Sequence, residues 1–322
     1  MWTSLVSVCI PSYNGARWIR EAIDSAQAQT YKPLEIVIVD DASTDNTLEI
    51  IRSYRDPRIR IEVNKKNLGP INNWNRCIKL AKGSLIKFLH QDDVLYPTCV
   101  EKMVRLFGLY QQIGLVFAQY DVLLENPIDP TAIVWKERYQ KLNTQFQYLS
   151  EVNNGRELFK TWLADGFKGN WIGGPSNVML RKAFLEHIGM FNTRLREIVD
   201  YELWIRMMYF YDIGFINETL STYRKHLSSL SASNIRQDHS WLDRLWFLEG
   251  FIQHEDIRSS YPRIKRLRYL EFCRLVINQI NRIRRREPIQ IFYKFRTLAY
   301  YFNYYVRALI GHPPPLHEYR AL

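Results

Sequence analysis

The chain has 322 residues and a net charge of +11, and 47% of its residues are apolar and 24% charged. This composition is typical of a globular protein and excludes a disordered chain. No apolar run approaches the roughly 20 residues that a membrane-spanning helix needs, and the N-terminus lacks the features of a signal peptide. Its four cysteines are too dispersed for a zinc knot or a disulfide scaffold. We therefore expect one large or two modest domains in the cytoplasm.

The positive charge is concentrated near the C-terminus. Between Tyr261 and Ile310, twelve Lys or Arg residues stand against two Glu, so the rest of the chain is close to neutral. In this tail the basic residues alternate with aromatic and aliphatic ones at near-helical spacing. Such a segment can lie on an anionic membrane surface, pack on the rest of the chain or in a homodimer, or bind nucleic acid. Nucleic acid is the least favoured partner, because no known nucleic-acid module accompanies the tail.

The first 120 residues alternate between β-rich runs and helical patterns. Short apolar or alternating runs predict strands at residues 5–10, 34–39, 58–63, 84–89 and 113–118. Between them, apolar residues follow helical spacing at 19–26, 47–54, 71–81 and 100–107. Regular alternation of this kind predicts an α/β fold, with a mostly parallel sheet and helices on both of its faces.

The pattern changes twice along the chain. Residues 121–235 are less regular and contain the loop-like ENPIDPTA, the glycine-rich GNWIGGPSNVML and a helical pattern in DYELWIRMMYF. Residues 236–322 are helical, basic and aromatic. We therefore predict three parts: residues 1–120 and 121–235 as the two halves of the α/β domain, and residues 236–322 as a helical extension.

Polar residues follow three of the predicted strands. These are the turn Pro11–Asn14, the pair Asp40 and Asp41, and the pair Asp92 and Asp93. In a parallel sheet the carboxyl ends of the strands meet at one edge, where ligands bind. The first acidic pair can accept hydrogen bonds from a nucleotide or cap a helix, and the second can bind Mg²⁺ or Mn²⁺ or cap the next helix. No glycine-rich phosphate loop is present, so a metal is the natural counter-charge for phosphates.

Five segments occur in the order and spacing of the family 2 glycosyltransferases, and they are SVCIPSYNG, VDDASTDNT, NLGPINNWN, KFLHQDD and VDYELWIRM. The chain resembles that family over about residues 4–230. The resemblance implies a GT-A fold and an inverting enzyme that moves one sugar from a UDP, dTDP or GDP sugar to a glycan or lipid-linked glycan acceptor. It also implies Mn²⁺ or Mg²⁺ as cofactor and a role in surface polysaccharide synthesis. If the acceptor is carried on a lipid, contact of the basic tail with the inner face of the plasma membrane would be useful. The motif of processive synthases is absent, so we expect single additions.

The resemblance also implies which residues bind the nucleotide. Pro11 and Tyr13 would line the pocket for the base. Asp41, with Asp40 beside it, would hold the base or the ribose.

The resemblance places the metal at the second acidic pair. The family's Asp-x-Asp motif aligns with His90-Gln91-Asp92, so its first acid is replaced here. Asp92 would reach the metal and Asp93 would support it. Related enzymes often have a histidine near the diphosphate at the position of His226.

The catalytic base implied by the resemblance is Asp200. Relatives carry a Glu-Asp pair there, and this chain has Val199 and Asp200. A carboxylate at this point can take the proton of the acceptor hydroxyl, and we expect the dipole of the helix that follows to lower its pKa. The alternative is a simple helix cap. Because two family acids are replaced, a non-catalytic binding subunit of a glycan assembly complex is the second hypothesis.

Overall fold

The computed structural model describes residues 3–125, 149–166, 169–226, 228–230, 240–253, 255–262 and 264–267, and positions 133, 136, 137, 269–271 and 273. Residues up to Leu267 form one compact unit, and the chain from Arg268 onward forms a second. Most of the predicted tail, Tyr261–Ile310, and most of ENPIDPTA lie outside the described residues. In the described part of the chain, no helix is both long enough and apolar enough to cross a membrane.

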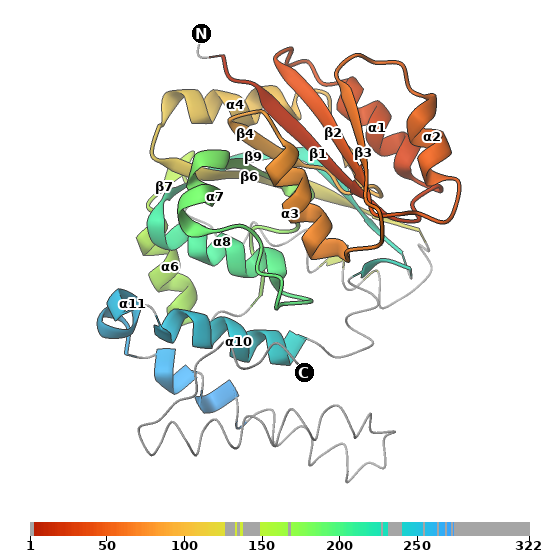
Figure 1. Cartoon of the computed structure of the whole chain (residues 1–322). Coiled ribbons are helices and arrows are strands. Elements are labelled where there is room, and N and C mark those ends of the chain that lie inside the picture. Colours follow the sequence, from red (N-terminus) through yellow and green to blue (C-terminus); the bar gives the residue numbers. More distant parts are fainter. Residues whose placement is uncertain are drawn as a thin grey trace, which may run out of the picture. The chain divides into compact units, whose positions relative to one another are not determined.

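A single sheet organises the first unit (Figure 1). Its described strands are β1 (Val6–Ser12), β2 (Leu34–Asp40), β3 (Ile59–Val63), β4 (Leu85–Phe88), β5 (Val94–Leu95), β6 (Ile113–Leu124), β7 (Val152–Asn153), β8 (Val178–Arg181) and β9 (Asp212–Lys225). Their order is β3-β2-β1-β4-β8-β6-β9-β5, and β7 pairs with β9. Strands β1–β4, β6 and β9 run in one direction, and β5, β7 and β8 oppose them. The sheet is therefore mixed but mostly parallel, as the sequence predicts.

Helices cover both faces of this sheet. On one face the core includes side chains of α1 (Ile19–Gln27), α2 (Thr47–Ser53) and α4 (Cys99–Leu109). On the other it includes side chains of α3 (Pro70–Leu80), α6 (Gly155–Ala164), α7 (Lys182–Ile188), α8 (Val199–Phe210), α10 (Ser240–Gln253) and α11 (Glu255–Ser260). The alternation of strand side chains makes both cores: Val8 and Ile10 enter the first, and Cys9 between them enters the second.

The predicted elements of the first 120 residues are all present, but strands β5, β7, β8 and β9 were not predicted. Strand β8 begins inside the glycine-rich segment and ends at Arg181, one residue beyond it. Strand β9 contains the exposed turn-like residues Asn217 and Glu218, and its pairing with β6 has register shifts near Ala118 and Gln119. Such a bulge interrupts the alternation by which a strand is recognised in sequence.

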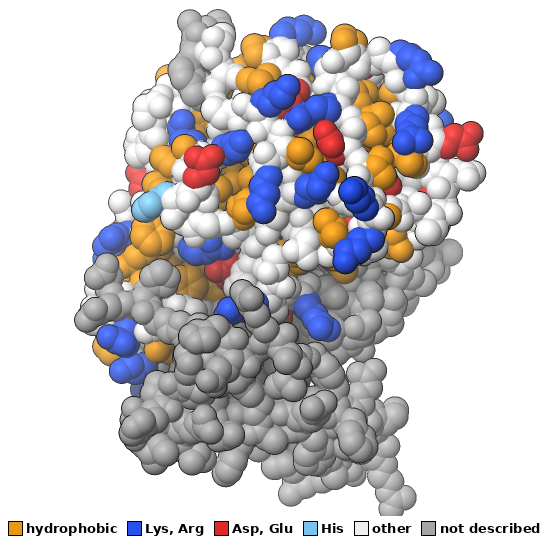
Figure 2. All heavy atoms as spheres, viewed as in Figure 1, with side chains coloured by type: hydrophobic (Ala, Val, Ile, Leu, Met, Phe, Trp, Pro, Cys, Tyr) orange, Lys and Arg blue, Asp and Glu red, His pale blue; other side chains and the backbone are white. Residues whose placement is uncertain are grey.

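Positive charge also occurs on the α/β unit. Figure 2 shows more Lys and Arg than Asp and Glu on the face that carries α3. Exposed lysines on and beside this helix are Lys65, Lys66, Lys79 and Lys82. The described unit is thus locally basic, although the chain outside the tail has almost no net charge.

Gly155 begins α6 where the backbone of α8 approaches it most closely. A Cβ at this position would lie 1.9 Å from the carbonyl oxygen of Tyr211 and 2.4 Å from that of Met208. Because backbone atoms cannot rotate away, we expect Gly155→Ala to lower the free energy of unfolding by about 1–3 kcal/mol. Chemical denaturation measures this change.

Gly250→Ala is the matched control. Gly250 is exposed in α10 and has no atom within 4 Å of an added Cβ, so alanine there should leave stability unchanged or raise it by up to about 1 kcal/mol. Equal unfolding midpoints for the two variants would contradict the close approach of α6 and α8.

Candidate active site

A cavity of about 620 Å³ opens at the carboxyl ends of the central strands. Strand β1 pairs with both β2 and β4, but β4 ends at Phe88, opposite Cys9, while β1 continues to Ser12. The pairing of β1 with β4 thus ends at Cys9, at the edge of the sheet where ligands bind in open α/β folds. Pro11 lies beyond Cys9, where its missing N–H removes no bond to β4. The lining includes most of the predicted site residues, namely Pro11, Tyr13, Asp41, Asp92, Asp93, Asp200 and His226.

The loops after β1, β2 and β4 are tied to one another at this edge. The Asn14 amide donates to Ser43 Oγ at 2.9 Å, and the Thr44 amide donates to Asn14 Oδ1 at 2.8 Å. The Gln91 side chain accepts from the amide of Tyr13 at 2.9 Å and donates to the Tyr13 carbonyl at 3.0 Å. Asn14 has φ 48° and Ala42 has φ 60°, so both loops hold a residue in the left-handed region. These hydrogen bonds therefore order this wall of the cavity.

The two residues of the first acidic pair, Asp40 and Asp41, lie in different environments. Asp41 lines the cavity and accepts hydrogen bonds from the Asn64 side chain and from the amides of Leu68 and Gly69, at 2.6–3.0 Å. Asp40 is fully buried, is not among the lining residues, and accepts from the amide and hydroxyl of Ser43. Asp41, itself only 1% exposed, thus orders the loop before α3 at the wall of the cavity, and Asp40 orders the loop after β2.

The second acidic pair forms a compact cluster with His90. Ligand atoms of His90, Asp92 and Asp93 all lie within 4.8 Å of one another. His90 Nε2 is buried and has no hydrogen-bond partner among the described residues, and burial lowers the pKa of this histidine. A neutral imidazole with an unused nitrogen beside two carboxylates matches the donors that Mn²⁺ accepts. The residues present therefore fit a divalent cation.

Asp93 is the residue of this cluster in which the charged form is disfavoured. Burial and the neighbouring Asp92 raise its pKa to about 8. Its Oδ1 accepts from the Arg224 amide at 2.9 Å, so the carboxylate contacts β9 and does not cap α4. Without a cation, the buried pair favours holding a proton.

Strand β9 brings further groups to the acidic pair. His226 Nε2 lies 2.9 Å from Asp92 Oδ2, and its ring packs at a tilt against Trp18, with centroids 4.0 Å apart. Arg224 donates to the Asp92 carbonyl at 2.9 Å and forms an ion pair with Glu21 at 2.5 Å. His226 was predicted from the resemblance, whereas Arg224 was missed because nothing local in the sequence points to Asp92.

Beneath the cluster lies a buried lysine. Lys87 donates to the Ser176 carbonyl at 2.5 Å, and burial lowers its pKa. The Ser176 hydroxyl in turn accepts from the His90 amide at 2.9 Å. The glycine-rich segment, which contains Ser176, is thereby fastened to the end of β4.

Asp200 lies in the first turn of α8. Its Oδ2 accepts from Asn170 Nδ2 at 3.2 Å, and its Oδ1 accepts from the Tyr201 amide at 2.7 Å. Burial raises the pKa of Asp200 to about 7, so the expectation that the helix dipole lowers it is wrong. The loss of solvation outweighs the dipole and these hydrogen bonds. Near neutral pH this carboxyl can therefore both accept and release a proton.

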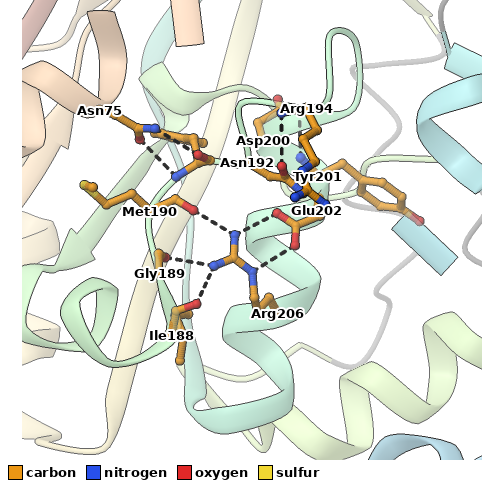
Figure 3. A network of polar contacts seen from close by, with 11 residues as sticks. Asn75, Ile188, Gly189, Met190, Asn192, Arg194, Asp200, Tyr201, Glu202 and Arg206 are labelled. Carbon is orange, nitrogen blue, oxygen red and sulfur yellow. Dashed lines mark hydrogen bonds and ion pairs between the residues drawn. The ribbon is translucent and has the colours of Figure 1, made fainter. Parts of the chain in front are cut away.

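Other polar residues of α8 are structural. Glu202 forms a bidentate ion pair with Arg206, at 2.7 and 2.8 Å, and Arg206 also donates to the carbonyls of Ile188, Gly189 and Met190 (Figure 3). This pair fastens α8 to the segment after α7. It leaves Asp200 as the acid of α8 that lines the cavity.

Sequence comparisons identify relatives. A family model described as Glycosyl transferase family 2 matches residues 7–159. An uncharacterized protein from Mycobacterium tuberculosis is 31% identical over 80% of this chain and 79% of its own length. An uncharacterized glycosyltransferase from Rickettsia prowazekii is 30% identical over 79% of this chain and 73% of its own length. A shorter match, 44% identical, joins 35% of this chain to 12% of the chondroitin synthase of Pasteurella multocida.

Solved structures share the fold. TarS 1–349 from S. aureus, in complex with UDP-GlcNAc, has a TM-score of 0.59 and 18% identity over 78% of this chain and 67% of that one. The mannosyltransferase PcManGT from Pyrobaculum calidifontis, in complex with GDP-Man and Mn²⁺, has a TM-score of 0.55 and 16% identity. The match covers 96% of this chain and 88% of that one. The predicted α/β fold of GT-A type is thus confirmed. Together with the sequence matches, these findings show that the chain belongs to glycosyl transferase family 2.

Proposed function

We propose that the protein is an inverting, metal-dependent glycosyltransferase that moves one sugar from a nucleoside-diphosphate sugar to an acceptor hydroxyl. The observation that carries this proposal is a single cavity that holds both the cluster of His90, Asp92 and Asp93 and the carboxyl of Asp200. A cation site and a titratable base beside one space are the two components that such a transfer needs. The titles of the neighbouring structures, which name UDP-GlcNAc, GDP-Man and Mn²⁺, support it.

The nucleoside would lie along the wall made by the loops after β1 and β2. Pro11 and Tyr13 offer apolar surface to the base, and Asp41 offers carboxylate oxygens to the base or ribose. Trp74 also lines the cavity and packs at a tilt against His90, with centroids 4.8 Å apart. The diphosphate would then reach the acidic cluster at the end of β4.

The divalent cation would be held by Asp92 and Asp93, with His90 or His226 as nitrogen ligands. When bound, Mn²⁺ or Mg²⁺ supplies positive charge that stabilises the leaving diphosphate. Asp200 accepts the proton of the acceptor hydroxyl while that oxygen attacks the anomeric carbon. The bond from this carbon to the diphosphate oxygen breaks, and a nucleoside diphosphate leaves. A single displacement inverts the anomeric centre.

We further propose a glycan or lipid-linked glycan as acceptor, in the synthesis of a surface polysaccharide. The match to a chondroitin synthase supports a glycan acceptor. Contact of the tail Tyr261–Ile310 with the inner face of the plasma membrane, and a homodimer, stay predictions, as do the three domain limits.

A second candidate function is favoured by two replacements. His90 stands in place of the first acid of the metal motif, and Val199 stands in place of the acid before Asp200. A protein that binds nucleotide sugars without transferring them would keep the cavity and tolerate both changes. Substitution of Asp200 distinguishes a transferase from a binding protein, because only the transferase would lose turnover.

Metal-dependent nucleotide binding is the first test. We expect UDP or GDP with Mn²⁺ to raise the unfolding temperature, because a ligand at about 100 times its Kd stabilises the folded state by about 2.7 kcal/mol. Asp92→Ala should remove the part of the shift that depends on Mn²⁺, whereas exposed Asp165→Asn should leave it unchanged. If no nucleoside diphosphate shifts the wild-type protein, the proposal fails.

Asp200→Asn tests the base. The amide cannot accept the proton, so we expect kcat for sugar transfer or donor hydrolysis to fall about 10²–10⁴-fold, while binding of nucleotide and Mn²⁺ persists. Asp165→Asn again serves as the control. Wild-type turnover in Asp200→Asn would exclude this residue as base, and absence of turnover in the wild type would favour the binding subunit.

The pH dependence follows from the raised pKa of Asp200. The base must be ionised, and its pKa is about 7, so kcat should rise with pH through about 7 and level off above it. The profile is measured at saturating donor and Mn²⁺, so that metal binding by Asp93 does not contribute. A kcat that is constant between pH 5 and 8 would contradict the assignment.

A further inference from the structure

We propose that Asp243, on helix α10, is a positioning residue that fixes the segment carrying Asp200. Helix α10 lies beyond residues 7–159, which the family model matches. The inference concerns how the fold holds the base in place, and its catalytic part rests on the function proposed above for Asp200.

Three successive amides converge on one oxygen of Asp243. Its Oδ2 accepts from the amides of Arg196 at 2.8 Å, Glu197 at 2.5 Å and Ile198 at 3.1 Å. The Asp243 residue is only 3% exposed. Consecutive N–H groups form an anion-binding concavity, and charge-assisted bonds of this kind are stronger than neutral ones. The same amides lead into α8, whose first N–H groups lack partners within the helix.

The segment held in this way is part of the cavity wall. Arg196, Glu197, Val199 and Asp200 all line the cavity, and Asp200 follows the last bonded amide by two residues. Asn170 donates a hydrogen bond to the Asp200 carboxyl itself. Two elements therefore position the Asp200 carboxyl. The loop that contains Asn170 bonds the carboxyl, and α10 bonds the backbone that precedes it.

Helix α10 has an anchor that does not depend on Asp243. Phe247 stacks on Tyr201 with centroids 5.8 Å apart, and Phe251 packs against Phe159 at 5.8 Å. Both phenylalanines are buried in the core. Loss of one carboxylate should therefore leave the helix docked while it frees the amides of residues 196–198. Displacement of a reacting group by about 1 Å can reduce turnover about 10²-fold.

The experiment compares three variants of the full chain. Asp243→Ala removes the acceptor, Asp243→Asn keeps one neutral acceptor oxygen, and Arg244→Met is the control from the next position. Arg244 donates to the Gly166 carbonyl at 3.0 Å. Hydrogen exchange of the peptide containing these amides is measured, together with Kd for UDP and Mn²⁺. Turnover is followed as hydrolysis of UDP-GlcNAc or GDP-mannose, whichever stabilises the wild type.

We expect Asp243→Ala to exchange these amides faster and to lose kcat about 10–100-fold, with Kd within about threefold of wild type. In Asp243→Asn, kcat should fall about 3–10-fold. In Arg244→Met, both amide exchange and kcat should match wild type. Wild-type exchange and kcat in Asp243→Ala would overturn the proposal, as would a parallel loss of nucleotide binding. If Asp243→Ala does not fold, wild-type values in Asp243→Asn overturn it.

The exchange measurement separates this inference from the proposed function. It reports whether Asp243 orders residues 196–198 and needs no turnover. If the wild type hydrolyses no donor, or Asp200→Asn keeps full activity, the proposed function fails. Unchanged exchange in the Asp243 variants would still refute the positioning role on its own.

Discussion

Burial of carboxylates at one edge of the sheet is the constraint on which the site depends. A buried carboxylate is unfavourable unless hydrogen bonds, a cation or a proton compensate it. Asp41 is compensated by three donors from the loop before α3. Asp93 and Asp200 are not fully compensated, and burial raises the pKa of both. The two groups with uncompensated charge are those for which we propose a metal ion and a proton as partners.

The second half of the chain positions groups that the first half supplies. Asp92 and Asp93 end a segment begun by β4, yet β9 brings Arg224 and His226 against them. The mixed sheet makes this possible, because β8 enters between β4 and β6 and β9 runs beside β6. Helix α10 also acts from far along the chain, because its Asp243 accepts hydrogen bonds from the amides just before α8. The residues of the candidate site are thus ordered by contacts that are distant in sequence.

The two replaced acids have different physical consequences. His90 keeps a nitrogen donor beside Asp92 and Asp93, so the cluster retains three groups that can bind a cation. Val199 is buried at 2% exposure within the core, where a carboxylate would be unfavourable. Its replacement leaves Asp200 the acid at the start of α8 that lines the cavity. The polar neighbour of Asp200 is Asn170, from the glycine-rich segment.

The sequence by itself determined the α/β class, the order of five strands and four helices in the first 120 residues, and the polar strand ends, because alternation and helical spacing are local signals. It also led to Asp92, Asp93 and Asp200, through motifs that are contiguous in the chain. Only the tertiary structure decided that Asp40 lies behind the wall and Asp41 faces the cavity. It likewise reversed the expected direction of the pKa of Asp200. Burial and long-range hydrogen bonds decide where a carboxyl group faces and how its pKa shifts. Neither can be read from the residues next to it in the sequence.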